Sequence, residues 1–103
     1  MSIKRFDAAR DLNDLALANA AKKMGWYLCF TDTPCDYFGS LIARPEMGFF
    51  AIEIKNGELA RLTEKQQFFH LECTRMRLRH LLWRSLDDVI ESTNRLRAER
   101  LGS

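Results

Sequence analysis

The stretch FFAIEIK, which ends at Lys55, constrains the fold most because it places two charges in an otherwise apolar strand. Side chains on a strand alternate between its two faces, so Glu53 and Lys55 project to one side and the isoleucines beside them to the other. The apolar residues 49–51 indicate that this strand is largely buried. A buried carboxylate is costly unless it is paired or binds a metal, and one lysine relieves only part of that cost. Glu53 therefore calls for a further partner.

The size and composition of the chain indicate one ordinary globular domain. With 103 residues and 47% hydrophobic content, it is too short for two independent cores. Its three cysteines form neither a CxxC pair nor an even-numbered framework, which favours a reduced, intracellular setting. The N-terminal stretch MSIKRFDAARDLNDL lacks the apolar region of a secretory signal, and no apolar run is long enough to span a bilayer. We expect a cytoplasmic protein without a membrane segment.

The pattern of apolar residues, caps and turns predicts the element order αβββαβα, a single α/β domain with a mixed sheet flanked by helices. Helices are expected at residues 7–24, 63–76 and 85–101, and strands at residues 26–30, 35–43, 49–55 and 78–83. Asp7 is the predicted N-cap of the first helix and Gly25 its stop. The connection RPEMG is so short that the second and third strands are expected to pair antiparallel.

Helical spacing also predicts which side chains the first two helices bury. The first helix is expected to bury a face that contains Ala8, Leu12, Leu15 and Asn19. The second is expected to bury a stripe that contains Leu62, Phe69, Cys73 and Met76. Phe68 is expected in the core as well, rather than stacked on a base. His70 is expected on the helix surface and His80 within strand packing, because neither has metal-ligand spacing to the other or to a cysteine.

Asp36 is the candidate partner of Glu53. It begins the strand next to residues 49–55 in the predicted hairpin and follows Pro34, which stiffens its approach. Asp36, Glu53 and the backbone carbonyl of Ile54 offer oxygen ligands of the kind that bind Mg²⁺ or Mn²⁺. Lys55 beside them is suited to position a water or to stabilise charge on a phosphodiester. An edge strand with a solvent-exposed ion pair explains the same spacing without any chemistry.

Basic residues gather in the last third of the chain, although the net charge is only +2. The first group contains Arg75, Arg77, Arg79 and Arg84. Because a strand with alternate arginines can follow a phosphate backbone, these four are candidate DNA-binding residues. Solvated helix and strand surface accounts for the same charges equally simply.

Four segments, PCDYFG, FFAIEIK, LTEKQ and WRSLDDV, in this order resemble the PD-(D/E)xK nuclease superfamily, and within it the VRR-NUC domains and the RecU-like Holliday junction resolvases. The resemblance extends over residues 34–89 and implies an αβββαβ restriction-endonuclease-like core. It implies that Asp36 and Glu53 are metal ligands and that Lys55 is the catalytic lysine. It also places Gln66 near the active site, whereas the pattern T-x-x-Q makes Gln66 the capping-box partner of Thr63.

The resemblance further implies an endodeoxyribonuclease that uses Mg²⁺ or Mn²⁺ and acts on branched DNA as a homodimer. Standalone domains of this kind are common in phage and mobile elements. Many members carry a Glu in the first helix, and this predicted helix has none. The candidates to replace it are Asp11, Asp14 and Asn19. The alternative interpretation is helix surface for the two aspartates and a hydrogen-bonded core position for Asn19. The departure leaves a second function open, a catalytically inactive nuclease-like module that binds DNA or protein.

Overall fold

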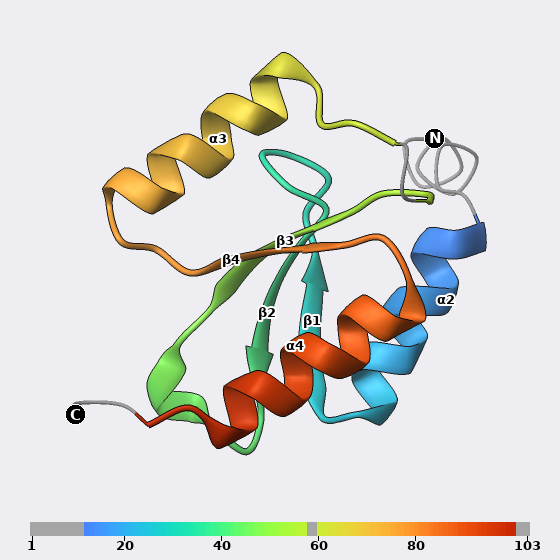
Figure 1. Cartoon of the computed structure of the whole chain (residues 1–103), viewed down its shortest axis with the longest axis vertical. Helices are drawn as coiled ribbons and strands as arrows, with labels where there is room; N and C mark the ends of the chain where they lie inside the picture. The colour runs from blue at the N-terminus through green and yellow to red at the C-terminus, as the bar shows by residue number, and fades with distance from the viewer. Residues whose placement is uncertain (1–11, 58–59, 101–103) are drawn as a thin grey trace.

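The computed structural model describes residues 12–57 and 60–100. The elements in these residues are α2 (Leu12–Lys23), β1 (Trp26–Phe30), β2 (Tyr37–Leu41), the 3-10 helix η1 (Pro45–Met47), β3 (Phe50–Ile54), α3 (Glu64–Arg75), β4 (His80–Trp83) and α4 (Leu86–Ala98). This order confirms the predicted αβββαβα succession within one α/β domain (Figure 1). The predicted N-cap Asp7 lies outside the described residues.

The four strands form one mixed sheet in the order β1-β2-β3-β4. β1 pairs with β2 and β2 with β3 in antiparallel fashion, which confirms the hairpin predicted from the short β2–β3 connection. β3 pairs with β4 in parallel, in a register that sets Glu53 opposite Leu82. A parallel pair needs a long crossover, and α3 supplies it. β3 therefore lies inside the sheet, with a neighbour on each side.

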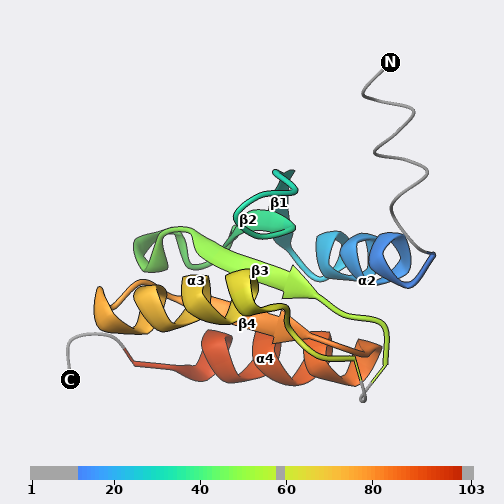
Figure 2. The ribbon, with the colours of Figure 1, turned by 90° about the horizontal axis from the view of Figure 1, so that it is seen from above.

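Helices cover the β3–β4 part of the sheet from two directions, with α3 on one side and α4 on the other (Figures 1 and 2). The larger core contains Trp26, Phe50 and Trp83 together with residues of α2 and α4. The ring of Trp26 meets those of Phe50 and Trp83 edge-on, each with a centroid separation of 5.4 Å. Both buried indoles are satisfied, because Trp26 donates to Thr93 and Trp83 donates to Ser92.

A smaller core lies under α3 on the other face of the sheet. It contains the buried Cys35, Ala51 and Cys73, with Phe38 and Phe69 packed against it. On β3, Ala51 belongs to this face, and the period of two places Glu53 on the same face. The side chain of Glu53 therefore projects toward α3, while the larger core holds the opposite face of the strand.

Two predicted helix faces are wrong in part. On α2 the buried side chains are Asp14, Leu17, Ala18 and Ala21, whereas Leu15 is 40% exposed and Asn19 is exposed. The predicted core position of Asn19 is therefore excluded. Alanine and leucine occur on every side of this helix, so spacing alone selects its buried face weakly.

Three aromatic or apolar positions near α3 and β3 are also corrected. Phe68 and Met76 are exposed, at 65% and 50%, and Phe49 before β3 is 61% exposed. His70, predicted at the helix surface, is buried. The sheet beneath α3 is covered by a narrow strip of the helix that contains Phe69 and Cys73, and Phe68 lies off that strip.

Candidate active site

Asp36 is held at the start of β2 by backbone contacts on both sides. Its carbonyl accepts from the N–H of Thr31 at 2.9 Å, which closes the β1–β2 loop. Its carboxylate Oδ2 accepts from the N–H of Ile54 at 2.8 Å, which ties it to the end of β3. Lys55 N–H bonds to β4, so by strand alternation the backbone of Ile54 faces β2 and Asp36. The predicted pairing of Asp36 with the end of β3 is confirmed.

Glu53 is the buried carboxylate of the sheet, with only 2% of its surface exposed. One oxygen, Oε2, accepts a hydrogen bond from Gln66 at 2.9 Å. The other, Oε1, is buried and has no hydrogen-bond partner among the described residues. Burial and then the charge of Asp36 raise the pKa of Glu53 to about 8, while the charge of Lys55 opposes this increase. A solvent-exposed ion pair on an edge strand is therefore excluded.

The side chain of Gln66 completes the predicted capping box and also contacts Glu53. Its Oε1 accepts from the N–H of Thr63 at 2.9 Å, and Thr63 Oγ1 accepts from the N–H of Gln66, which completes the capping box at the start of α3. Its Nε2 remains to donate to Glu53. The helix cap thus fixes the amide that orients the buried carboxylate.

Lys55 follows β3 and is half-buried. Its N–H donates to the carbonyl of Trp83 at 3.0 Å, so the parallel pairing with β4 fixes its backbone. The strand period places its side chain on the same face as Glu53. The charge of Lys55 partly offsets the increase in the pKa of Glu53, which agrees with that placement.

Asp14 joins this group of charges from α2, which corrects the prediction that it lies at the helix surface. It is only 8% exposed and accepts a hydrogen bond from the Tyr37 hydroxyl at 3.2 Å. Its charge contributes to the raised pKa of Glu53. The first helix therefore does bring a carboxylate toward Glu53, although as Asp rather than Glu. Its helical spacing with Leu17, Ala18 and Ala21 is only a weak signal for this position, because alanine and leucine occur on every side of the helix. Asp11 lies outside the described residues.

The residues present fit a small divalent cation. Glu53 Oε1 is a buried carboxylate oxygen without a partner, and Asp36 provides a second carboxylate at the same end of β3. Mg²⁺ typically takes one or two protein carboxylates and keeps several waters, so two such groups suffice. Among residues 12–57 and 60–100, no set of three or more His, Cys, Asp or Glu side chains is arranged to hold an ion. The fit is therefore to a two-carboxylate site rather than to a closed protein cage.

The candidate DNA-binding arginines do not alternate along a strand, which corrects that prediction. All four lie outside β4: Arg75 ends α3, Arg77 and Arg79 precede the strand, and Arg84 follows it. Arg75 pairs with Glu72 at 2.6 Å, and Arg79 pairs with Glu99 at 2.5 Å. Arg84 donates to the carbonyl of Ala60. Arg77 and Arg79 line one groove, whereas Arg84 lines a different pocket at the other end of β4.

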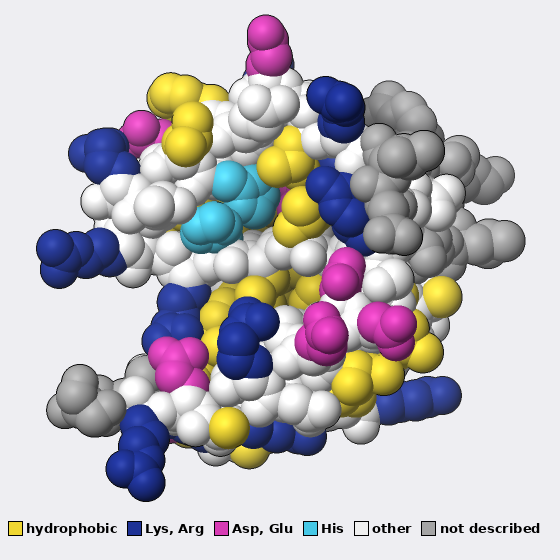
Figure 3. Space-filling view, viewed as in Figure 1, with side chains coloured by type: hydrophobic (Ala, Val, Ile, Leu, Met, Phe, Trp, Pro, Cys, Tyr) yellow, Lys and Arg dark blue, Asp and Glu magenta, His cyan; other side chains and the backbone are white. Residues whose placement is uncertain are grey.

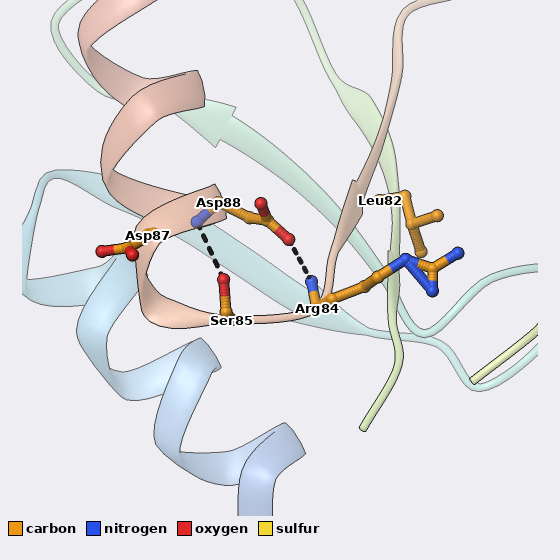
Figure 4. A pocket seen from close by; sticks show the side chains of 5 residues that line it. All are labelled: Leu82, Arg84, Ser85, Asp87 and Asp88. Atoms are coloured by element: carbon orange, nitrogen blue, oxygen red, sulfur yellow. Dashed lines mark hydrogen bonds between the residues drawn. The ribbon is translucent and has the colours of Figure 1, made fainter. Parts of the chain in front are cut away.

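The pocket at the end of β4 is lined by Leu82, Arg84, Ser85, Asp87 and Asp88 (Figure 4). Two of its residues, Ser85 and Asp88, make hydrogen bonds at the start of α4. Ser85 Oγ accepts from the N–H of Asp88 at 3.3 Å, and Asp88 Oδ2 accepts from the N–H of Arg84 at 2.8 Å. Ser85 is the N-cap of α4, and Ser85 and Asp88 have a structural role in joining β4 to α4.

A pair of histidines, which the sequence did not predict, joins α3 to β4. His70 Nδ1 and His80 Nδ1 lie 2.9 Å apart, and Thr74 Oγ1 lies 3.0 Å from His80 Nε2. Both rings are visible side by side in Figure 3. Burial and the neighbouring His80 lower the pKa of His70. One ring must donate and the other accept, so the contact fixes a single shared proton between α3 and β4.

Comparisons with known proteins add no relative: no protein-family model, curated protein or solved structure matches this chain. In the part of the chain that the structure describes, the helices are too short or too polar to cross a membrane.

Proposed function

We propose that this protein is an endodeoxyribonuclease that hydrolyses DNA phosphodiesters with Mg²⁺ or Mn²⁺, on a restriction-endonuclease-like αβββαβ core. The observation that carries the proposal is Glu53, a fully buried carboxylate with one oxygen unpartnered among the described residues and with Asp36 beside it. Such an arrangement is costly for a purely structural sheet. Strongly perturbed carboxylates of this kind cluster at functional sites.

The roles of the side chains follow from their contacts. Asp36 and Glu53 would hold the cation, with Asp36 fixed by the N–H of Ile54 and Glu53 oriented by Gln66. When bound, a divalent cation supplies Lewis-acid chemistry for phosphodiester hydrolysis. Lys55 projects from the same strand face and provides a fixed positive charge for the phosphate or for the attacking water.

The resemblance to RecU-like resolvases supports DNA as the substrate, and branched DNA in particular. It also supports a homodimer as the active form. Arg77 and Arg79 line one groove with Arg95, near the C-terminal end of α4. Guanidinium groups in a groove are suited to contact phosphates, so this groove is the candidate for the DNA backbone. Within the groove Arg79 is paired with Glu99, so Arg77 and Arg95 are the stronger candidates there. Arg75 and Arg84 lie outside this groove, and Arg75 pairs with Glu72 while Arg84 donates to Ala60.

The test is cleavage of labelled linear duplex, single strand, flap and four-way junction with Mg²⁺ or Mn²⁺. Wild type is compared with Lys55→Ala and with Lys22→Ala, an exposed lysine in the last turn of α2. Metal-dependent cutting that is lost in Lys55→Ala and kept in Lys22→Ala supports the proposal. If wild type binds DNA and cuts no substrate with either metal, the chain is instead a nuclease-like binding module.

A further inference from the structure

A groove lies between the β1–β2 loop and the first three turns of α3. It has a volume of about 430 Å³, and its lining includes Pro34 of the loop and Phe68 and Phe69 of α3. The loop is fixed at its base, because Thr31 N–H and Asp32 N–H both donate to the carbonyl of Asp36. The groove is therefore formed by an ordered loop facing one side of a capped helix.

Phe68 is the feature of this groove that the fold does not explain. Lys65, Phe68, Phe69 and Glu72 form one stripe along α3 and all line the groove. Phe69 packs against the small core under the helix, whereas Phe68 leaves 65% of its surface exposed. An aromatic side chain that is held in a groove and contributes little to the core is suited to contact a ligand.

The groove adjoins the proposed metal site through Gln66, which lines the groove and also donates to Glu53. Asp36 lies at the end of the same loop that carries Pro34. A nucleotide whose phosphate lies at Asp36 and Glu53 therefore has this groove beside it.

We propose that the groove binds an unpaired nucleobase next to the scissile phosphate, stacked on Phe68. The inference rests on the proposed nuclease function and names a selectivity device for it. A base needs an apolar face and hydrogen-bonding groups around its edge, and the groove offers Phe68 and Pro34 with Asp32 and Thr63 at its margins. Lys65 on the same wall supplies a positive charge for the adjoining phosphate.

The groove favours unpaired bases over duplex. A base in a duplex is already stacked and paired, so entering the groove requires that it be extruded, whereas a base in a single strand or at a branch point is free to enter. Phe68 thus selects for DNA with unpaired nucleotides at the cleavage position.

The experiment uses the full chain carrying Lys55→Ala, which prevents cutting, with Mg²⁺ present. Binding of a short labelled single strand is compared with binding of the same strand made abasic at successive positions. Phe68→Ala is compared with the matched control Phe49→Ala, an aromatic of similar exposure that lies outside the groove. Melting temperatures of both variants verify folding.

We expect Phe68→Ala to weaken binding of the intact strand roughly tenfold, the effect of removing one base-stacking aromatic. Phe49→Ala should leave binding unchanged. An abasic nucleotide at one position of the strand should remove the difference in binding affinity between Phe68→Ala and its parent.

Three results would overturn the inference. They are equal binding by Phe68→Ala and its parent, an equal loss of affinity in Phe68→Ala and Phe49→Ala, and no binding of the single strand at all. Its failure is distinct from that of the nuclease proposal, which is judged by metal-dependent cleavage by wild type. Binding that depends on Phe68 without any cleavage would reject the nuclease and retain the base-binding groove. Cleavage by wild type, together with binding that does not depend on Phe68, would retain the nuclease and reject the base-binding groove.

Discussion

Replacing Glu53 by Gln should stabilise the metal-free protein, because the native carboxylate is buried at a cost. Its pKa is raised from 4.5 to about 8, first by burial and then by the charge of Asp36. Glutamine keeps an oxygen that can accept from Gln66 and places no charge beside Asp36. The substitution therefore removes an unfavourable ionisation while preserving the shape of the side chain.

The sign of the effect depends on pH. A carboxyl whose folded-state pKa is raised keeps its full contribution to stability below the unfolded pKa and loses it as pH rises through the folded pKa. Between the unfolded pKa of 4.5 and the folded pKa of about 8, each pH unit lowers the free energy of unfolding by about 1.4 kcal/mol. Wild type therefore loses roughly 3 kcal/mol of stability by about pH 7 and approaches its maximum loss near pH 8. Glu53→Gln does not titrate at this position and avoids the loss.

The assay is urea unfolding of wild type and Glu53→Gln in EDTA, at several pH values from about 4.5 to 8.5. We expect the free energy of unfolding of the variant to exceed that of wild type by roughly 2–3 kcal/mol near pH 7, which corresponds to a melting temperature higher by on the order of 10 °C. Glu91→Gln, at an exposed position on α4, is the matched control and should show no such difference.

The reasoning is refuted if the difference between Glu53→Gln and wild type does not increase with pH, or if Glu91→Gln shows the same increase. Adding Mg²⁺ provides an independent check. If Glu53 is a ligand, the cation stabilises wild type and not the variant, so the gap between them closes.

Three further substitutions test the site and the core. Mg²⁺ at about ten times its Kd should stabilise wild type by about 1.4 kcal/mol and should leave Asp36→Ala unchanged, as read from melting curves with and without the metal. Gly39→Ala should destabilise by roughly 1–3 kcal/mol in urea unfolding, because its Cβ would lie 2.6 Å from Leu28 Cδ2; an unchanged midpoint would show that the sheet accommodates the methyl. Thr93→Val should cost roughly 1–3 kcal/mol, since it leaves the buried indole N–H of Trp26 without its acceptor, and wild-type stability in this variant would contradict that role.

Much of the fold followed from local rules. Caps, turn residues and the change of apolar period from helix to strand predicted the order of elements and the antiparallel hairpin. That hairpin was enough to bring Asp36 beside the end of β3, because a short connection fixes the pairing of its two strands. The capping box of Thr63 and Gln66 was also predictable, since both residues lie within one turn.

Other features depended on which helix face meets the sheet. Asp14 is buried because α2 packs through the side that carries it, and helical spacing in an alanine-rich segment did not select that side. Phe68 is exposed because the sheet under α3 is covered by its neighbour Phe69. The arginines do not alternate along a strand, because β4 begins only at His80, after Arg79, and ends at Trp83, before Arg84.

The sequence by itself determined the elements, their order and the charged pair at the end of β3, because these depend on interactions between residues close in the chain. Only the tertiary structure decided that Glu53 is fully buried, that Asp14 and Gln66 interact with it from two different helices, and that His70 contacts His80. Those outcomes depend on how helices pack on the sheet, and packing is set by the shapes of many side chains at once rather than by any local pattern.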